Sequence, residues 1–236
     1  MKKTVRPVAS DAVRSEWLRR VEAEYRSAAI TQHLGLWLLQ IGASPDLVKL
    51  CMRVASDEVA HADLSFRCYT AAEGHALPHI PRETLELVRT ADPLEYDVTR
   101  VVVDVFCLGE TVAVPLFKNL REDCSVPAAR RVLDRVLRDE VRHRDFGWVA
   151  LEWLLEHPLA PQFRRLIAIE LPRFFGRMRA TYAPPAAAGL RSVSAADRAW
   201  GLMAPARYAE VLSRTVDRDW VPRFAKLGID ARVAWG

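Results

Sequence analysis

One ten-residue pattern occurs twice in the chain and decides the fold that we expect. Residues 57–66 read DEVAHADLSF and residues 139–148 read DEVRHRDFGW, so both contain D-E-V-x-H-x-D followed by an apolar residue. Each copy lies inside a long segment with the 3.6-residue periodicity of an α-helix. A Glu and a His three positions apart lie about 60° apart around such a helix, one turn apart in height. Their side chains can therefore converge on one metal ion.

The helix face that carries each Glu-His pair is otherwise almost entirely apolar. Its other members are Cys51, Val54, Ser65 and Cys68 in the first copy, and Leu133, Val136, Gly147, Ala150 and Leu154 in the second. Burying charged groups is unfavourable unless they are paired or bind a metal. Glu58, His61, Glu140 and His143 are therefore predicted to be buried for a reason, and a metal site provides one.

Two other long helical segments each supply one carboxylate on an apolar face. Glu24 lies on the face of Trp17 and Val21, whereas Glu22 shares its face with polar residues and is expected to be solvated. Glu110 stands alone among apolar residues. Four Glu and two His on four helices form the ligand pattern of a di-iron carboxylate site. The alternative is a solvated helix face with accidental Glu-His spacing, which the two copies and the two matching carboxylates disfavour.

The whole chain is predicted to be all-α, because hairpin signals are absent and long amphipathic segments dominate. Helices are expected at about residues 10–41, 44–73, 92–121 and 125–156, with short, long and short connections. This order is typical of a four-helix bundle with one long crossover. Two additional C-terminal helices, at about residues 161–181 and 194–216, are expected to pack on it. The predicted domains are thus the bundle, residues 1–157, and a helical extension, residues 158–236.

Composition narrows the classes of protein. The chain has 236 residues, half of them apolar, with a formal net charge of +4, which suits a globular protein and does not point to nucleic acid as a partner. The longest apolar stretch is interrupted by Asp104 and Glu110, so no membrane span is expected. No signal peptide is recognised. The four cysteines show no CxxC spacing and are interpreted as reduced thiols of a cytoplasmic protein.

The bundle, residues 10–157, resembles the ferritin-like di-iron carboxylate proteins. The string Asp139-Glu140-Val141-Arg142-His143 matches the D-E-x-R-H motif of di-iron oxygenases and desaturases, and the Glu24 region with the block at 57–66 is similar to a bacterial group of ferritin-like proteins. The resemblance implies six metal ligands. They are Glu24, Glu58, His61, Glu110, Glu140 and His143, with Glu58 and Glu140 bridging two iron ions.

The Asp that precedes each bridging Glu has a role in the same resemblance. In the family it accepts a hydrogen bond from the ligand His of the opposite pair, which implies that Asp57 holds His143 and Asp139 holds His61. The physical need is general, because the second nitrogen of a ligand His requires an acceptor. The alternative is that both Asp are surface residues.

What the resemblance implies about function is a non-haem di-iron oxidase or monooxygenase that uses O₂ to oxidise a small organic substrate. Electrons would come from an external donor or reductase. A ferroxidase or peroxidase without an organic substrate is the alternative, although a His in both half-sites favours O₂ activation over iron storage. A tRNA hydroxylase is a third class, which the absence of basic runs with interleaved aromatics disfavours. Manganese in one or both positions suits the same ligands.

Small residues one turn from the ligands predict a pocket. Ala28, Ser65 and Gly147 follow Glu24, His61 and His143 on the same faces, and Val114 follows Glu110. Space beside the metals for a substrate or O₂ is one explanation, and close helix packing is the other.

The C-terminal part is rich in tryptophan. Trp200, Trp220 and Trp235 suggest that the last helices pack against the bundle or against a second subunit in a homodimer.

Overall fold

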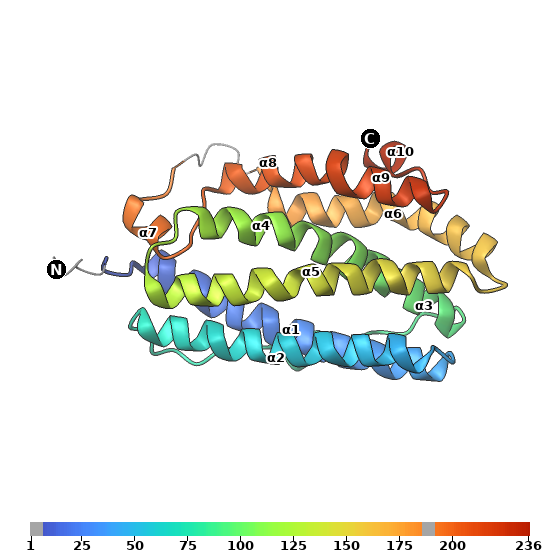
Figure 1. Ribbon diagram of the computed structural model, residues 1–236, viewed down its shortest axis with the longest axis horizontal. Coiled ribbons are helices and arrows are strands. Elements are labelled where there is room, and N and C mark those ends of the chain that lie inside the picture. Colours follow the sequence, from blue (N-terminus) through green and yellow to red (C-terminus); the bar gives the residue numbers. More distant parts are fainter. Residues whose placement is uncertain (1–6, 186–191) are drawn as a thin grey trace.

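The computed structural model describes residues 7–185 and 192–236, and all regular secondary structure in these ranges is helical. The predicted all-α class is therefore confirmed for this part of the chain. Figure 1 shows the long helices side by side, with their axes along the length of the molecule. None of the helices described is long and apolar enough to cross a membrane.

Four long helical segments carry the residues singled out in the sequence. They are α1 (Asp11–Gln40), α2 (Pro45–Ala71), a continuous rod of three parts, and α5 (Pro127–Leu155). The rod consists of α3 (Leu94–Val101), η2 (Val102–Glu110) and α4 (Thr111–Glu122). α1 packs along α2, α2 along α5, and α5 along η2 and α4.

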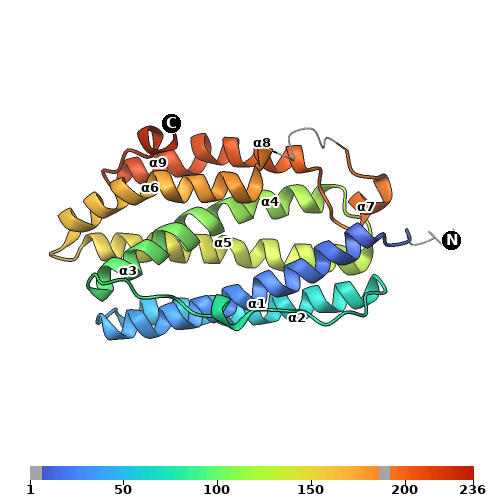
Figure 2. The ribbon, with the colours of Figure 1, turned by 180° about the vertical axis from the view of Figure 1, so that it is seen from behind.

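The first two helices begin at residues suited to helix N-termini. The Ser10 and Ser44 hydroxyls accept hydrogen bonds from the Val13 and Leu47 N–H groups, which caps α1 and α2. Pro45 occupies the first turn of α2, where its missing N–H is not needed. After α2, residues 72–93 run back along the α1–α2 hairpin to the other end of the molecule (Figure 2) and contain only the short 3₁₀ helix η1 (Arg82–Thr84).

The rod departs from α-helical geometry just before the predicted ligand Glu110. Residues Val102–Glu110 form a π-helix, and α4 then continues through Pro115. The sequence pattern predicts one α-helix for this rod, because π-helical turns have no sequence signature comparable to a cap or a proline. Such turns often occur at functional sites.

The C-terminal part differs from the two helices expected there. α6 (Ala160–Tyr182) matches the first, but α7 (Ala195–Ala199) and α8 (Pro205–Thr215) replace the second. The π-helical η4 (Val216–Trp220), α9 (Val221–Lys226) and α10 (Ala231–Trp235) follow it, where no helix was expected. The break after α7 has a local cause. Gly201 has φ of +83°, which a side chain would disfavour, and Pro205 starts a new helix in its first turn.

One hydrophobic core extends across the predicted domain boundary at residue 157. Leu34 of α1, Val102 of η2 and Leu151 of α5 belong to the same buried cluster as Phe163 of α6 and Phe224 of α9. The C-terminal helices therefore share the core of the ligand-bearing helices.

The tryptophans fix the C-terminal part to the rest of the chain. Trp200 and Trp220 are fully buried, and the Trp220 indole donates a hydrogen bond to the Cys107 carbonyl of η2 over 3.2 Å. The Trp17 indole of α1 donates to the Trp200 carbonyl over 3.1 Å. Trp200 and Trp220 thus pack against the long helices, which is one of the two outcomes that the sequence left open.

Gly147 allows α5 to approach η2 closely. A Cβ atom at this position would lie 2.6 Å from the Phe106 Cβ and 2.8 Å from the Phe106 carbonyl carbon. Backbone cannot move as cheaply as the end of a side chain, so overpacking here is expected to be destabilising.

We expect Gly147→Ala to lower the free energy of unfolding by about 1–3 kcal/mol. Gly176→Ala is the matched control, because a Cβ in that part of α6 meets no atom within 4 Å. The control should be stabilised by about 0.5–1 kcal/mol, since glycine is unfavourable inside a helix. Urea unfolding of both variants in the presence of a chelator measures this. Equal effects of the two substitutions would contradict close packing at Gly147.

Candidate metal centre

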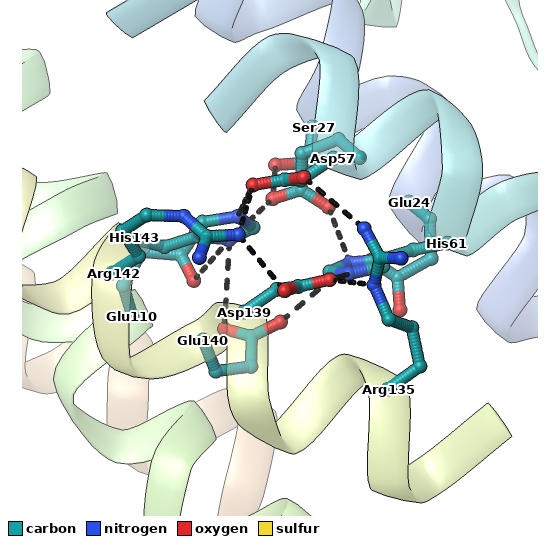
Figure 3. Close-up of polar contacts among 11 residues, drawn as sticks. Glu24, Ser27, Asp57, His61, Glu110, Arg135, Asp139, Glu140, Arg142 and His143 are labelled. Atoms are coloured by element: carbon teal, nitrogen blue, oxygen red, sulfur yellow. Dashed lines mark hydrogen bonds and ion pairs between the residues drawn. The ribbon is translucent and has the colours of Figure 1, made fainter. Parts of the chain in front are cut away.

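The structure brings the six predicted ligands together in the interior. Glu24 comes from α1, Glu58 and His61 from α2, Glu110 from the end of η2, and Glu140 and His143 from α5. All six are buried, and both histidines are completely so. Figure 3 shows the side chains of the five that it labels, Glu24, His61, Glu110, Glu140 and His143, converging on one small region. Their role as ligands stays a prediction.

His61 marks one half of the cluster. Its Nδ1 lies 3.7 Å from Glu24 Oε2, 3.5 Å from Glu58 Oε2 and 4.0 Å from Glu140 Oε1. Ligand atoms bound to one metal ion at about 2.0–2.2 Å are roughly 3–4 Å apart. These four side chains are therefore spaced as a set that could hold a metal ion.

His143 marks the other half in the same way. Its Nδ1 lies 3.4 Å from Glu58 Oε1, 3.9 Å from Glu110 Oε2 and 3.9 Å from Glu140 Oε2. The two imidazole rings are 5.5 Å apart between centroids.

Glu58 and Glu140 contribute to both halves. Each presents one carboxylate oxygen to the Nδ1 of His61 and its other oxygen to the Nδ1 of His143. Glu24 lies near His61 only, and Glu110 near His143 only, among the ion-pair contacts of the histidines. The geometry is thus that of two adjacent sites with two shared carboxylates.

The same atoms have unused hydrogen-bonding capacity. Within the described residues, Glu58 Oε2, Glu140 Oε2 and the Nδ1 atoms of His61 and His143 are buried and have no hydrogen-bond partner. Buried polar atoms in folded proteins are nearly always satisfied, so such a group of exceptions needs an explanation. Cations bound between these atoms would provide it.

Asp57, Asp139, Arg135 and Arg142 form a layer of ion-paired side chains on the Nε2 side of the histidines, which we call the ionic layer. The Nε2 of His61 is 3.2 Å from Asp139 Oδ2, and the Nε2 of His143 is 3.5 Å from Asp57 Oδ2. Each Asp therefore lies beside the histidine of the opposite Glu-His pair, as the family resemblance implied. Only the Asp139 contact is a hydrogen bond, because His143 Nε2 has no hydrogen-bond partner among the described residues. The neutral tautomer with hydrogen on Nε2 leaves the Nδ1 lone pair directed at the carboxylates.

Two arginines complete this layer. Arg142 Nη2 donates to Asp57 over 2.7 Å and to Asp139 over 2.8 Å. Arg135 pairs with Asp139 through Nε and lies 3.5 Å from Asp57 through Nη2. The two Asp charges are thereby balanced by two Arg charges, whose contacts Figure 3 shows. They need no cation bound among the glutamates to neutralise them.

Three of the four glutamates have raised pKa values, whereas burial is outweighed at Glu58 by His143 and His61, which hold its pKa well below the usual range. Burial raises the pKa of Glu24 to about 7, against the lowering effect of His61. Burial and the Glu110 charge raise the pKa of Glu140 well above its usual value, and burial with the Glu58 charge raises that of Glu110. Burial acts against the protonated form of His61, but Glu24 and Glu58 outweigh it and raise its pKa to about 11. The cluster therefore attracts positive charge, either protons or metal ions.

A cavity of about 360 Å³ reaches the carboxylates from one side. All four glutamates are in its lining, which also includes Ala113, Leu116 and Phe117 of α4, Met178 and Tyr182 of α6, and Tyr208 of α8. An external molecule in this cavity would lie directly beside the candidate metal positions.

The predicted pocket residues are wrong, because Ala28, Ser65, Val114 and Gly147 do not line this cavity. Ala28 and Ser65 are buried on α1 and α2, which pack on each other, and Gly147 lies against Phe106. The face of α4 at the cavity holds Ala113, Leu116 and Phe117 in place of Val114. Small residues here mainly permit close helix contact.

Several residues of the site were not predicted from the sequence. The Ser27 hydroxyl donates to Glu58 Oε1 over 2.8 Å, and its position three residues after Glu24 was a usable signal. Arg135, one turn before Asp139, was another. Tyr182 and Tyr208 had no such signal, because long-range packing brings them to the cavity.

The raised pKa values predict how pH affects the metal-free protein. The folded chain keeps protons on Glu24, Glu110 and Glu140 at pH values above about 4.3, where the unfolded chain has released them. The raised pKa values of His61 and His143 act in the same sense above about pH 6.5. Folded-state proton binding therefore exceeds that of the unfolded state, and stability falls as pH rises.

We expect the melting temperature of chelator-treated protein to be lower at about pH 8 than at about pH 6. Glu140→Gln should weaken this dependence, because it removes one titrating carboxyl from the cluster. Glu152→Gln, on the exposed side of α5, is the matched control and should leave it unchanged. Thermal unfolding followed by circular dichroism measures both. A melting temperature that rises over this range would contradict the electrostatic account of the cluster.

Comparison with known proteins identifies no relative for this chain: no family model, no curated protein and no solved structure matches it. The site's geometry is therefore the basis for its functional assignment.

Proposed function

We propose that this chain is a ferritin-like di-metal carboxylate protein that acts as a non-haem di-iron oxidase or oxygenase. The observation that carries the proposal is the position of Glu58 and Glu140, each with one oxygen toward His61 and the other toward His143. The arrangement of a short hairpin, a long crossover and two further long segments supports the ferritin-like assignment.

In this proposal Glu24 and His61 complete one metal position, and Glu110 and His143 the other. Four carboxylates carry four negative charges, which two divalent cations would neutralise, while Arg135 and Arg142 neutralise Asp57 and Asp139. Carboxylate and imidazole ligands suit iron and manganese alike. Iron in both positions is the proposed state, and a mixed manganese and iron pair suits the same ligands.

The protein's own groups hold this arrangement in place. Asp139 lies at hydrogen-bond distance from His61 Nε2 and fixes the orientation of that imidazole, whereas Asp57, 3.5 Å from His143 Nε2, acts on that ring through its charge. Both carboxylates favour hydrogen on Nε2, which makes Nδ1 available as a donor atom. The Ser27 hydroxyl orients Glu58. Redox-active metal ions bound here would supply the reaction with O₂ and the electron transfer to it.

The cavity supports an organic substrate over iron storage. It reaches the four glutamates and is lined between its polar ends by Ala23, Leu116, Phe117 and Met178. Ligand sites for small organic molecules are concave and predominantly apolar, with a few polar groups. Such an oxygenase would take its electrons from an external donor or reductase.

Metal content tests the ligand assignment. We expect two iron ions per chain after anaerobic reconstitution, and about one in Glu24→Ala and in Glu110→Ala, because each removes a ligand from one position only. Glu22→Ala is the matched control on α1, since Glu22 accepts a hydrogen bond from the His79 N–H group away from the cluster. Elemental analysis reports the stoichiometry. Full occupancy in Glu110→Ala would remove that residue from the ligand set.

Reaction with O₂ tests the assigned activity. We expect the iron(II)-loaded protein to consume O₂, and to stop binding iron at two ions per chain when more iron(II) is added. Oxygen uptake and protein-bound iron are measured in the same samples, with metal-free protein as the control. Continued accumulation of iron would favour a ferroxidase role, and no oxygen uptake would contradict the proposed function.

A further inference from the structure

The cavity at the glutamate cluster has a second polar end, which the metal positions do not use. Arg19 and Arg20 line it on α1 ahead of Glu24, and Tyr208 lines it from α8. Arg20 lies one helical turn before Glu24, so this end is next to the cluster along α1.

Arg20 is a charged residue whose side chain is buried. Its side chain is 5% exposed, its Nε lies 3.0 Å from Glu16 Oε1, and its Nη2 donates to the Gly201 carbonyl over 2.9 Å. Its Nη1 is buried and has no hydrogen-bond partner among the described residues. A buried guanidinium nitrogen without an acceptor is unfavourable, so an acceptor supplied from the cavity would be stabilising.

The charges at this end are unequal. Arg19 and Arg20 share one carboxylate, that of Glu16, which leaves one positive charge in excess. The Tyr208 phenol adds an O–H donor, and burial raises its pKa, so it stays protonated at neutral pH. A carboxylate is the natural complement of a guanidinium group and a phenol, because it accepts hydrogen bonds through both oxygens.

The other end of the cavity holds a carboxylate of the protein. Asp104, on η2, lines it, and its Oδ2 accepts a hydrogen bond from Arg177 Nη2 over 2.6 Å. Its Oδ1 is buried without a hydrogen-bond partner in the described part of the chain. A carboxylate has no hydrogen to donate to this oxygen, so it is better matched to the guanidinium group of Arg20 at the opposite end.

The wall between the two ends is apolar. It consists of Ala23 on α1, Ala113, Leu116, Phe117 and Leu120 on α4, and Met178 on α6. The Arg20 guanidinium carbon lies 4.5 Å from the centre of the Trp17 ring, so this side chain extends back from Glu24. The guanidinium group thus lies at the level of Trp17, seven residues before Glu24, and at a helical rise of about 1.5 Å per residue a ligand joining it to the cluster must span roughly 10 Å.

We propose that this cavity binds an elongated organic acid, with its carboxylate at Arg20 and Tyr208 and its apolar part extending to the metal positions at Glu24 and Glu110. The inference rests on the proposed function for the reaction that the ligand undergoes. The binding itself depends only on the cavity, so the two can be tested separately.

Three probes of equal chain length separate charge from apolar contact. Octanoate, 1-octanol and octylamine are titrated by isothermal calorimetry into zinc-loaded protein and into chelator-treated protein. We expect octanoate to bind to the zinc-loaded protein at least ten times more tightly than 1-octanol, and octylamine most weakly. Tryptophan fluorescence offers a second readout, because Trp17, one of the seven tryptophans, lies against the Arg20 guanidinium group.

Two variants locate the binding. Arg20→Gln should weaken octanoate binding at least tenfold and leave 1-octanol nearly unchanged, whereas Arg53→Gln, which removes the same charge from the exposed face of α2, should change neither. Because Arg20 also holds Glu16 and Gly201, its variant is checked for folding by circular dichroism. Ala113→Phe fills the apolar wall without touching Arg20 and should weaken both octanoate and 1-octanol.

The outcomes distinguish this inference from the proposed function. Three outcomes would overturn the organic-acid site. The first is equal affinity for octanoate and 1-octanol, and the second is no octanoate binding to either preparation. The third is unaltered octanoate binding in folded Arg20→Gln or in folded Ala113→Phe. If metal binding and O₂ uptake are intact in the same protein, the failure belongs to this inference alone. Selective octanoate binding without O₂ uptake would support the inference and contradict the oxidase assignment.

Discussion

The electrostatics of this interior depend on four glutamates that share a buried space. Glu24, Glu58, Glu110 and Glu140 cannot all remain charged there without positive charge between them, because burial disfavours each carboxylate and their charges repel one another. The two histidines alone carry too little positive charge to balance four carboxylates. Two divalent cations would supply the missing positive charge, in number and in position. Without them, burying these four carboxylates would be energetically unfavourable.

The ionic layer of Asp57, Asp139, Arg135 and Arg142 is the counterpart of this core. It is balanced in itself, so it orients the histidines without adding net charge. The separation of a neutral outer layer from an acidic inner one lets the carboxylates keep their affinity for cations. In the second sequence copy an Arg stands two positions after Glu140, and this Arg142 reaches both Asp side chains.

Periodicity and spacing predicted the long helices and the burial of six polar residues, because both depend on which face of a helix a residue occupies. The pairing of each Asp with the opposite His was implied by the family resemblance and not by the helix pattern. The C-terminal break and the cavity were beyond such reasoning. Gly201 and Pro205 end and start helices within a segment whose apolar pattern continues, and the π-helical turn before Glu110 changes the face without any marker residue. Ala28, Ser65 and Gly147 were misassigned because a small residue serves contact and space equally well in sequence.

The shared core of the two halves of the chain has an evolutionary consequence. All six candidate ligands precede residue 144, whereas Met178, Tyr182 and Tyr208, which form one wall of the cavity, follow residue 157. Substitutions in α6 and α8 can therefore reshape what fits beside the glutamates while every coordinating side chain is retained. Related chains could diverge in the compounds they accept through their C-terminal halves alone, and an engineer could follow the same route.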